Sequence, residues 1–244
     1  MSGHNKWSTI KHKKAREDAK RGKIFTRLIR EITVAARLGG GDPDGNPRLR
    51  SAVTAARGAN MPVDNIDRAI KRGTGELEGM TYEEVMYEGY GPGGVAILVE
   101  AVTDNKTRTV ADVRHLFTKF GGSLAEPNAV AWQFEQCGQI IVEGGEMDED
   151  TMMMAALEAG AEDVSSEEGF FVIQTTMDGL FDVEKSLQSQ GVEVKEAELT
   201  YLAKNLLEVP GDKIGSVERL MDALDDCDDV QKLHTNADFP EEQN

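Results

Sequence analysis

The first 75 residues of the chain place apolar side chains at a helical period. Four apolar residues fall on one face of the segment 23–38 at about 100° per residue: Ile24, Leu28, Ile32 and Ala35. Two further helices are predicted at about 46–57 and 61–73, because each carries a proline at its start, where the fixed φ of that residue favours a helix. The pattern predicts a small bundle of short helices.

The pattern changes at about residue 81, where strands and helices begin to alternate. Residues 136–199 show a complete β-α-β-β-α-β order, which is typical of a ferredoxin-like domain. On either side lies a half with two strands around one helix: 93–104, 107–122 and 128–136 before it, and 203–209, 212–226 and 229–235 after it. Two halves around one complete unit predict a second ferredoxin-like domain, interrupted by the first.

We therefore expect an α+β protein in which an N-terminal small helical bundle is followed by two ferredoxin-like α/β domains, one inserted within the other. The predicted domains are residues 1–80, residues 81–135 together with 200–244, and residues 136–199. Hydrophobic residues make up 39% of the chain. This composition supplies enough apolar sequence for packed cores and excludes a wholly disordered chain.

The net charge of −17 conceals a division of charge along the chain. Residues 1–75 hold 17 Lys and Arg against 7 Asp and Glu, whereas residues 76–244 hold 10 against 37. Such an asymmetry is typical of a protein that binds a polyanion with one end. We expect nucleic acid, either DNA or rRNA, as the partner of the basic end.

The candidate nucleic-acid-binding residues lie in the first 37 positions: Lys6, Trp7, Lys11, His12, Lys13, Lys14, Arg16, Lys20, Arg21, Lys23, Arg27, Arg30 and Arg37. The aromatic members can stack on bases or sugars. The last four, from Lys23 to Arg37, form a stripe opposite the apolar face, where we expect them to meet phosphates. Exposed charges of this kind change stability by only about 0.5 kcal/mol. The alternative is that this basic face docks on the acidic part of the same chain.

The sequence GYGPGG at 89–94 matches the dinucleotide-binding pattern letter for letter. That pattern follows a strand and opens a helix, whereas here it precedes a predicted strand. We therefore reject a nucleotide site and expect a tight loop. Four of its residues form a candidate contact surface: Tyr90, Gly91, Pro92 and Gly93.

No other motif indicates catalysis, so we expect no catalytic residue, no metal site and no cofactor. The four histidines have no ligand spacing, and no Ser or Cys lies in a recognisable triad context. The alternative of a different class is an enzyme that acts at the loop 89–94.

The sequence also predicts a cellular location. Cys137 and Cys227 have no CxxC spacing, which suits a reducing compartment. The longest nearly uncharged apolar run, residues 94–99, is too short to span a bilayer, and no apolar segment of a secretory signal follows the N-terminus. We expect a cytoplasmic protein with no membrane partner. The sequence does not determine the oligomeric state, and a monomer is compatible with it.

Three long stretches, residues 2–32, 46–73 and 87–109, resemble the YebC family. Its bacterial members are related to the mitochondrial translational activator of cytochrome c oxidase, and the resemblance runs from Ser2 to about Asp238. It implies a helical N-terminal domain and two α/β domains, one inserted in the other. The chain begins directly at the first family motif, which leaves no room for a mitochondrial presequence and favours a bacterial cytoplasmic member.

The resemblance also implies a class of function. Family members are usually catalogued as DNA-binding transcriptional regulators, whereas the mitochondrial relative and recent views of bacterial members point to translation and the ribosome. We expect a non-enzymatic nucleic-acid-binding regulator of gene expression. The alternative is a ribosome- or rRNA-binding translation factor, such as a translational activator that assists stalled elongation. The lack of a clear helix-turn-helix with base-reading side chains leans towards RNA.

Overall fold

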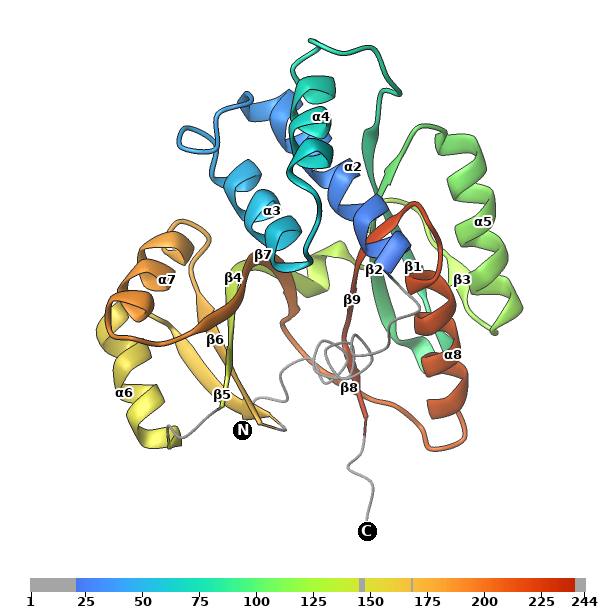
Figure 1. Cartoon of the computed structure of the whole chain (residues 1–244). Helices are drawn as coiled ribbons and strands as arrows, with labels where there is room; N and C mark the ends of the chain where they lie inside the picture. The colour runs from blue at the N-terminus through green and yellow to red at the C-terminus, as the bar shows by residue number, and fades with distance from the viewer. Residues whose placement is uncertain (1–20, 145–147, 168, 240–244) are drawn as a thin grey trace. The chain divides into compact units, whose positions relative to one another are not determined.

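A computed structural model describes residues 21–144, 148–167 and 169–239, and Figure 1 shows their helices and strands. The described chain forms two compact units. One holds residues 134–205, and the other holds residues 21–133 and 206–239. The sequence also predicts a helix at residues 11–23, with Ser8 or Thr9 as its cap, and the part of it before residue 21 lies outside the described residues.

The second of these units begins with three helices, α2 (Arg21–Gly39), α3 (Pro47–Gly58) and α4 (Val63–Gly73). Their apolar faces pack into one core: Ile32, Ala35, Ala36, Leu49, Ala52, Val53, Ala56, Met61, Ile66 and Ala69. Asn46 caps α3, because its side-chain oxygen accepts the N–H of Leu49 at 3.1 Å. Its amide donates to the carbonyls of Ala35 and Gly40, each at 2.8 Å, which ties the end of α2 to the start of α3. The predicted bundle of short helices is confirmed.

Gly73, the last residue of α4, lies against the backbone of α2. A Cβ built there would lie 2.4 Å from the carbonyl oxygen of Thr33. We expect Gly73→Ala to lower the free energy of unfolding by about 1–3 kcal/mol, the usual cost of overpacking. Urea unfolding followed by circular dichroism measures the change. Gly58→Ala, at the end of α3, is the matched control, because a Cβ there meets nothing within 4 Å. Equal losses in the two variants would contradict the close approach at Gly73.

The same unit continues as a four-stranded antiparallel sheet in the order β3-β1-β2-β9. Its strands are β1 (Glu83–Tyr90), β2 (Ala96–Thr103), β3 (Ser123–Leu124) and β9 (Val230–Thr235). The helices α5 (Lys106–Lys119) and α8 (Ile214–Asp225) contact each other and cover the sheet (Figure 1). Phe117 and Leu220 from these helices are fully buried. The sheet has the ferredoxin-like strand order, in which β1 takes the place of the third strand although it comes first along the chain.

Two of the strands predicted for this sheet are wrong. Residues 128–133 form a loop that ends in the short helix η3 (Ala131–Gln133), and the missing strand is β1, at 83–90. The predicted strand 203–209 contributes only β8 (Leu207–Glu208), which pairs in parallel with β10 (Ala237–Asp238) outside the four-stranded sheet. The apolar pattern does not predict β1, because three of its eight residues are glutamates. One of them, Glu88, is buried, so it occupies a position where the pattern expects an apolar residue.

The unit of residues 134–205 has the predicted β-α-β-β-α-β order. Its elements are β4 (Phe134–Glu143), α6 (Glu149–Ala159), β5 (Asp163–Glu167), β6 (Phe170–Thr175), α7 (Leu180–Ser189) and β7 (Val194–Ala203). The strands pair antiparallel in the order β5-β6-β4-β7, which is the ferredoxin-like order. Ile140, Ile173 and Leu187 lie fully buried in its core. The predicted α+β fold class is therefore confirmed.

Candidate nucleic-acid interface

The structure describes only part of the predicted binding segment. Eight of the candidate residues lie outside the described residues: Lys6, Trp7, Lys11, His12, Lys13, Lys14, Arg16 and Lys20. The side chain of Arg21 is not described either. The four candidates that can be placed, Lys23, Arg27, Arg30 and Arg37, all lie on α2.

Lys23 and Arg27 contact the C-terminal end of α8. The Lys23 amine lies 3.1 Å from a carboxylate oxygen of Asp226, and the Arg27 guanidinium lies 3.2 Å from one of Asp225. Both side chains also donate to the backbone carbonyl of Asp225. The last carbonyls of a helix have no partner within it and carry a partial negative charge, so they attract cations. The two basic side chains are only 18% and 15% exposed.

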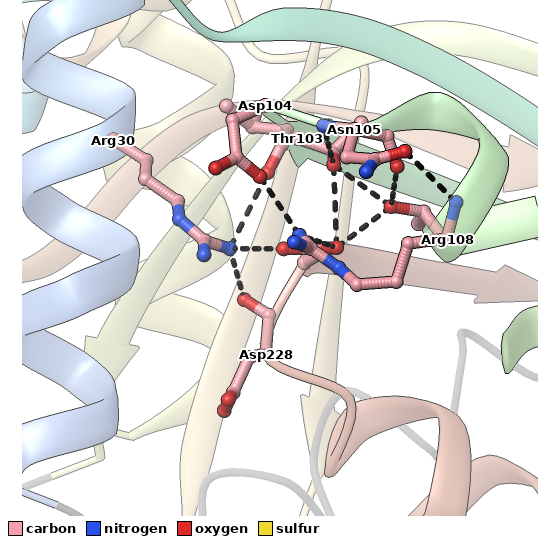
Figure 2. A network of polar contacts seen from close by, with 9 residues as sticks. Arg30, Thr103, Asp104, Asn105, Arg108 and Asp228 are labelled. Atoms are coloured by element: carbon pink, nitrogen blue, oxygen red, sulfur yellow. Dashed lines mark hydrogen bonds and ion pairs between the residues drawn. The ribbon is translucent and has the colours of Figure 1, made fainter. Parts of the chain in front are cut away.

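Arg30 reaches a buried carboxylate that a second arginine shares. Its guanidinium forms an ion pair with Asp229 at 3.0 Å, and Arg108 from α5 contacts the other carboxylate oxygen at 2.8 Å. Figure 2 shows Arg30 and Arg108 pointing towards each other from their two helices. The hydroxyls of Thr109 and Thr103 donate to the same oxygen as Arg108, at 2.6 and 3.2 Å.

The environment of Asp229 decides its protonation. Burial raises the pKa of this carboxyl, but the hydrogen bonds from Arg108 and Thr109, with the nearby charge of Arg30, outweigh that effect. Its pKa therefore lies below the ordinary value for aspartate. The side chain is 4% exposed and ionised at neutral pH. Because it pairs with Arg30 of α2 and Arg108 of α5, it joins these two helices to the start of β9.

These contacts match the alternative that the sequence left open, in which the basic face docks on acidic residues of the same chain. Lys23, Arg27 and Arg30 have internal partners, and a role of these three in phosphate binding stays a prediction. Arg37 is different, because it is exposed and forms no ion pair with any residue that the structure describes.

The helical part of this unit carries further basic side chains that the sequence analysis did not select. Within the described ranges, four of them are exposed and form neither an ion pair nor a side-chain hydrogen bond: Arg57 on α3 and Arg68, Lys71 and Arg72 on α4. Arg50 on α3 is also exposed, but its guanidinium donates to the carbonyls of Pro43 and Asp44 at 3.0 and 2.8 Å. Arg48 differs, because Glu31 and Glu84 bind its guanidinium at 2.7 and 2.5 Å. The sequence-based candidates all lie before residue 40, where basic residues are most densely clustered, so these later positions were not among them. A helical projection of 63–73 places its basic residues opposite the buried Ile66 and Ala69.

The segment GYGPGG forms the hairpin turn between β1 and β2, with the short helix η2 (Pro92–Gly94) inside it. Gly93 and Gly94 have φ values of 79° and 84°, which only glycine adopts without strain. The turn joins two antiparallel strands and opens no long helix, so it lacks the geometry of a dinucleotide site. Gly91 and Pro92 are buried, which leaves Tyr90 and Gly93 as the exposed part of the candidate contact loop.

An exposed tryptophan lies beside this turn. Trp132 is 67% exposed, and its indole N–H donates to the carbonyl of Ala129 at 3.0 Å, which also accepts the hydroxyl of Tyr90 at 3.0 Å. The buried carboxylate of Glu88 accepts the N–H groups of Asn128, Val130 and Ala131 and fixes this loop. Burial raises the pKa of Glu88, but these backbone donors hold it below the ordinary value. The sequence predicts a strand at residues 128–136, so it does not indicate this loop.

The described residues hold no candidate for a site of another kind. No group of three or more His, Cys, Asp or Glu there is arranged to hold a metal ion. Neither cysteine forms a disulfide. No helix in the described ranges is both long enough and apolar enough to cross a membrane.

Comparison with protein families gives two matches that together cover most of the chain. Residues 5–76 match the model of the TACO1/YebC protein N-terminal domain. Residues 82–237 match the model of the TACO1/YebC second and third domain.

Similar proteins match over nearly their full length. A "Probable transcriptional regulatory protein" from Desulfatibacillum aliphaticivorans is 57% identical over 99% of this chain and 98% of its own. A protein of the same name from Acidithiobacillus ferrooxidans is 57% identical over 100% of this chain and 97% of its own length. Among solved structures, a conserved hypothetical protein from Aquifex aeolicus has a TM-score of 0.89 and 46% identity, over 94% of this chain and 95% of that one.

Proposed function

The chain belongs to the TACO1/YebC family, and from this premise we propose that it binds nucleic acid and regulates gene expression without catalysing a reaction. The names of its relatives support the regulatory part of the proposal, because they are called probable transcriptional regulatory proteins. The nucleic-acid-binding part rests on the distribution of charge.

One observation carries that second part. Five basic side chains of the helical region are exposed and form neither an ion pair nor a side-chain hydrogen bond with any described residue: Arg37, Arg57, Arg68, Lys71 and Arg72. A basic group that is neither buried nor paired is free to meet a phosphate, whereas Lys23, Arg27 and Arg30 are occupied. Clustering of basic residues on one part of a protein is the electrostatic pattern of nucleic-acid binding.

A ribosome- or RNA-directed role is the second candidate, and the start of α4 favours it. Residues 59–62 join α3 and α4, a spacing that resembles a helix-turn-helix. In such a motif the first turn of the second helix meets base edges in the major groove. Here Asp64 occupies that turn and Asp67 follows it, both exposed, so carboxylates would enter the major groove of a negatively charged duplex. This arrangement favours binding through phosphates, without reading of a DNA sequence.

The salt dependence of binding tests the proposal. If the five unpaired basic residues each neutralise one phosphate, counterion release predicts a slope of log K against log salt of roughly −3.5 for single strands and −4.5 for duplex DNA. Fluorescence anisotropy with a labelled oligouridine and a labelled DNA duplex, each from 50 to 300 mM salt, measures both slopes. Failure of the full chain to bind either probe at 50 mM salt would overturn the proposed function.

A further inference from the structure

We propose that a cleft between the ends of α2 and α4 is the site that binds a phosphodiester group of the nucleic acid, with Arg37 and Arg72 as the two phosphate-binding residues. The inference rests on the proposed function, and it names the binding site. The chemistry expected of the ligand is a phosphate group on a polynucleotide chain.

The cleft has a volume of about 270 Å³. Its walls come from three segments of one unit: residues 33–37 of α2, residues 72–75 at the end of α4, and residues 77–82 before β1. Pockets for drug-sized molecules start at about 300 Å³ and are mostly apolar. This smaller cleft, with two arginines in its lining, suits one unit of a strand that runs across it.

The charges in the lining favour an anion. Arg37 and Arg72 are exposed and have no ion-pair partner among the residues described, whereas Glu78 is the single carboxylate that lines the cleft. A second carboxylate, Glu83, has a lowered pKa, first because of its hydrogen bond with Lys106 and to a smaller extent because of the charge of Arg37. Lys106 already binds Glu83 at 2.5 Å, so Arg37 is not needed to neutralise it.

Close packing holds the two arginines in place relative to each other. Gly73, next to Arg72, lies so near α2 that a Cβ would lie 3.1 Å from the backbone nitrogen of Arg37. The stem of Arg72 crosses Gly79, where a Cβ would lie 3.1 Å from its Cδ. The junction fixes the backbone positions from which the two guanidinium groups extend, and each group presents a fork that fits two phosphate oxygens.

An aromatic side chain completes the site. Tyr82 lines the cleft, and the guanidinium of Arg30 lies 5.5 Å from its ring centroid, which helps to fix the ring. Sites for single-stranded nucleic acid combine basic residues with aromatic rings on which bases stack. The combination of Arg37, Arg72 and Tyr82 therefore fits a single strand better than a free anion.

The test compares two double variants of the full chain. Arg37→Gln with Arg72→Gln removes both charges of the cleft. Arg114→Gln with Lys119→Gln removes two exposed charges from α5, neither of which forms an ion pair within the described chain. Anisotropy with labelled oligouridine gives the affinity and salt slope of each, and thermal unfolding checks that both retain the wild-type midpoint.

We expect the cleft variant to bind at least tenfold more weakly than wild type at 100 mM salt. Its slope should become less negative by about 1.4, the value for two single-strand phosphate contacts. The α5 variant should stay within threefold of wild type. If wild type binds oligouridine and both variants bind it with nearly the wild-type affinity, the cleft assignment is wrong while the proposed function stands. If wild type binds neither RNA nor DNA, both are wrong.

Inorganic phosphate is the second probe, because a free anion presents the same oxygens. We expect up to 10 mM phosphate to leave the unfolding midpoint of wild type and of the cleft variant equally unchanged. A midpoint that rises only in wild type, in a protein that binds no oligonucleotide, would assign the cleft to a free anion and overturn the proposal.

Discussion

Reversing Lys23, Arg27 and Arg30 to glutamate in one variant is expected to destabilise the protein by about 5 kcal/mol or more. Two of the three ion pairs that this change breaks are largely buried, since Arg27 and Asp225 are 15% and 17% exposed and Arg30 and Asp229 are 11% and 4% exposed. Loss of one partner of a buried pair costs about 3–5 kcal/mol. Lys23 adds little, because its partner Asp226 is 66% exposed.

The reversed side chains would also face carboxylates and the carbonyl end of α8, where a negative charge is unfavourable. Guanidinium unfolding followed by circular dichroism measures the loss. The matched control reverses Arg57, Arg68 and Lys71, which are exposed and pair with no described residue, so each should change stability by only about 0.5 kcal/mol. A triple variant at Lys23, Arg27 and Arg30 that is as stable as this control would restore the sequence-based prediction of a free phosphate-binding stripe.

The second large effect is expected from Asp229→Asn, which should lower the free energy of unfolding by about 3–5 kcal/mol at pH 7. An amide keeps the shape of the side chain, but it leaves Arg30, which is 11% exposed, without a countercharge and leaves Arg108 with Asp104 alone. Asp228→Asn is the matched control, because that neighbouring side chain is exposed and Arg30 contacts only its backbone carbonyl.

The same variant has a predictable pH dependence. The pKa of Asp229 is lowered on folding. Its ionised form therefore contributes stability above the unfolded value of about 3.9, and this contribution is lost as the pH falls through the folded pKa. The difference in unfolding free energy between wild type and Asp229→Asn should be constant from pH 7 to 5 and shrink below about pH 4. Urea unfolding at each pH measures it, and a difference that grows on acidification would contradict the assigned network.

The sequence predicted elements well where one residue type decides the local structure. Asn46 and Pro47 mark the start of α3, because the asparagine cap and the fixed φ of proline both act within one turn. The β-α-β-β-α-β order was also predicted, at residues 136–199, and the structure has it within residues 134–205.

Prediction failed where distant residues decide the outcome. The sequence analysis ends one predicted strand at residue 136 and begins the next unit there, yet β4 runs on through both, with Gly138 inside it, where a Cβ would lie 2.2 Å from the hydroxyl of Thr175. Glu88 looks like a surface residue until the loop that donates three N–H groups to it is in place. Both depend on partners about 40 residues away in the sequence.

The candidate site shows the same limit. The helical period correctly placed Lys23, Arg27 and Arg30 opposite the apolar face of α2, but it carries no information on what faces them. Their partners are Asp225, Asp226 and Asp229, nearly two hundred residues later, and only the fold brings α8 and β9 to that side of α2. The unpaired residues of α3 and α4 became candidates only after the paired ones were known.

Ultraviolet crosslinking in living cells, followed by mass spectrometry of the crosslinked peptides and sequencing of the attached nucleic acid, tests the central claim most directly. We expect crosslinked peptides from residues 1–80, with Tyr82 and its neighbours at the border of the site. The sequenced fragments identify the partner as rRNA, another RNA or DNA. Crosslinks confined to residues 134–205, or a complete absence of crosslinks from a protein that is present and folded, would contradict it.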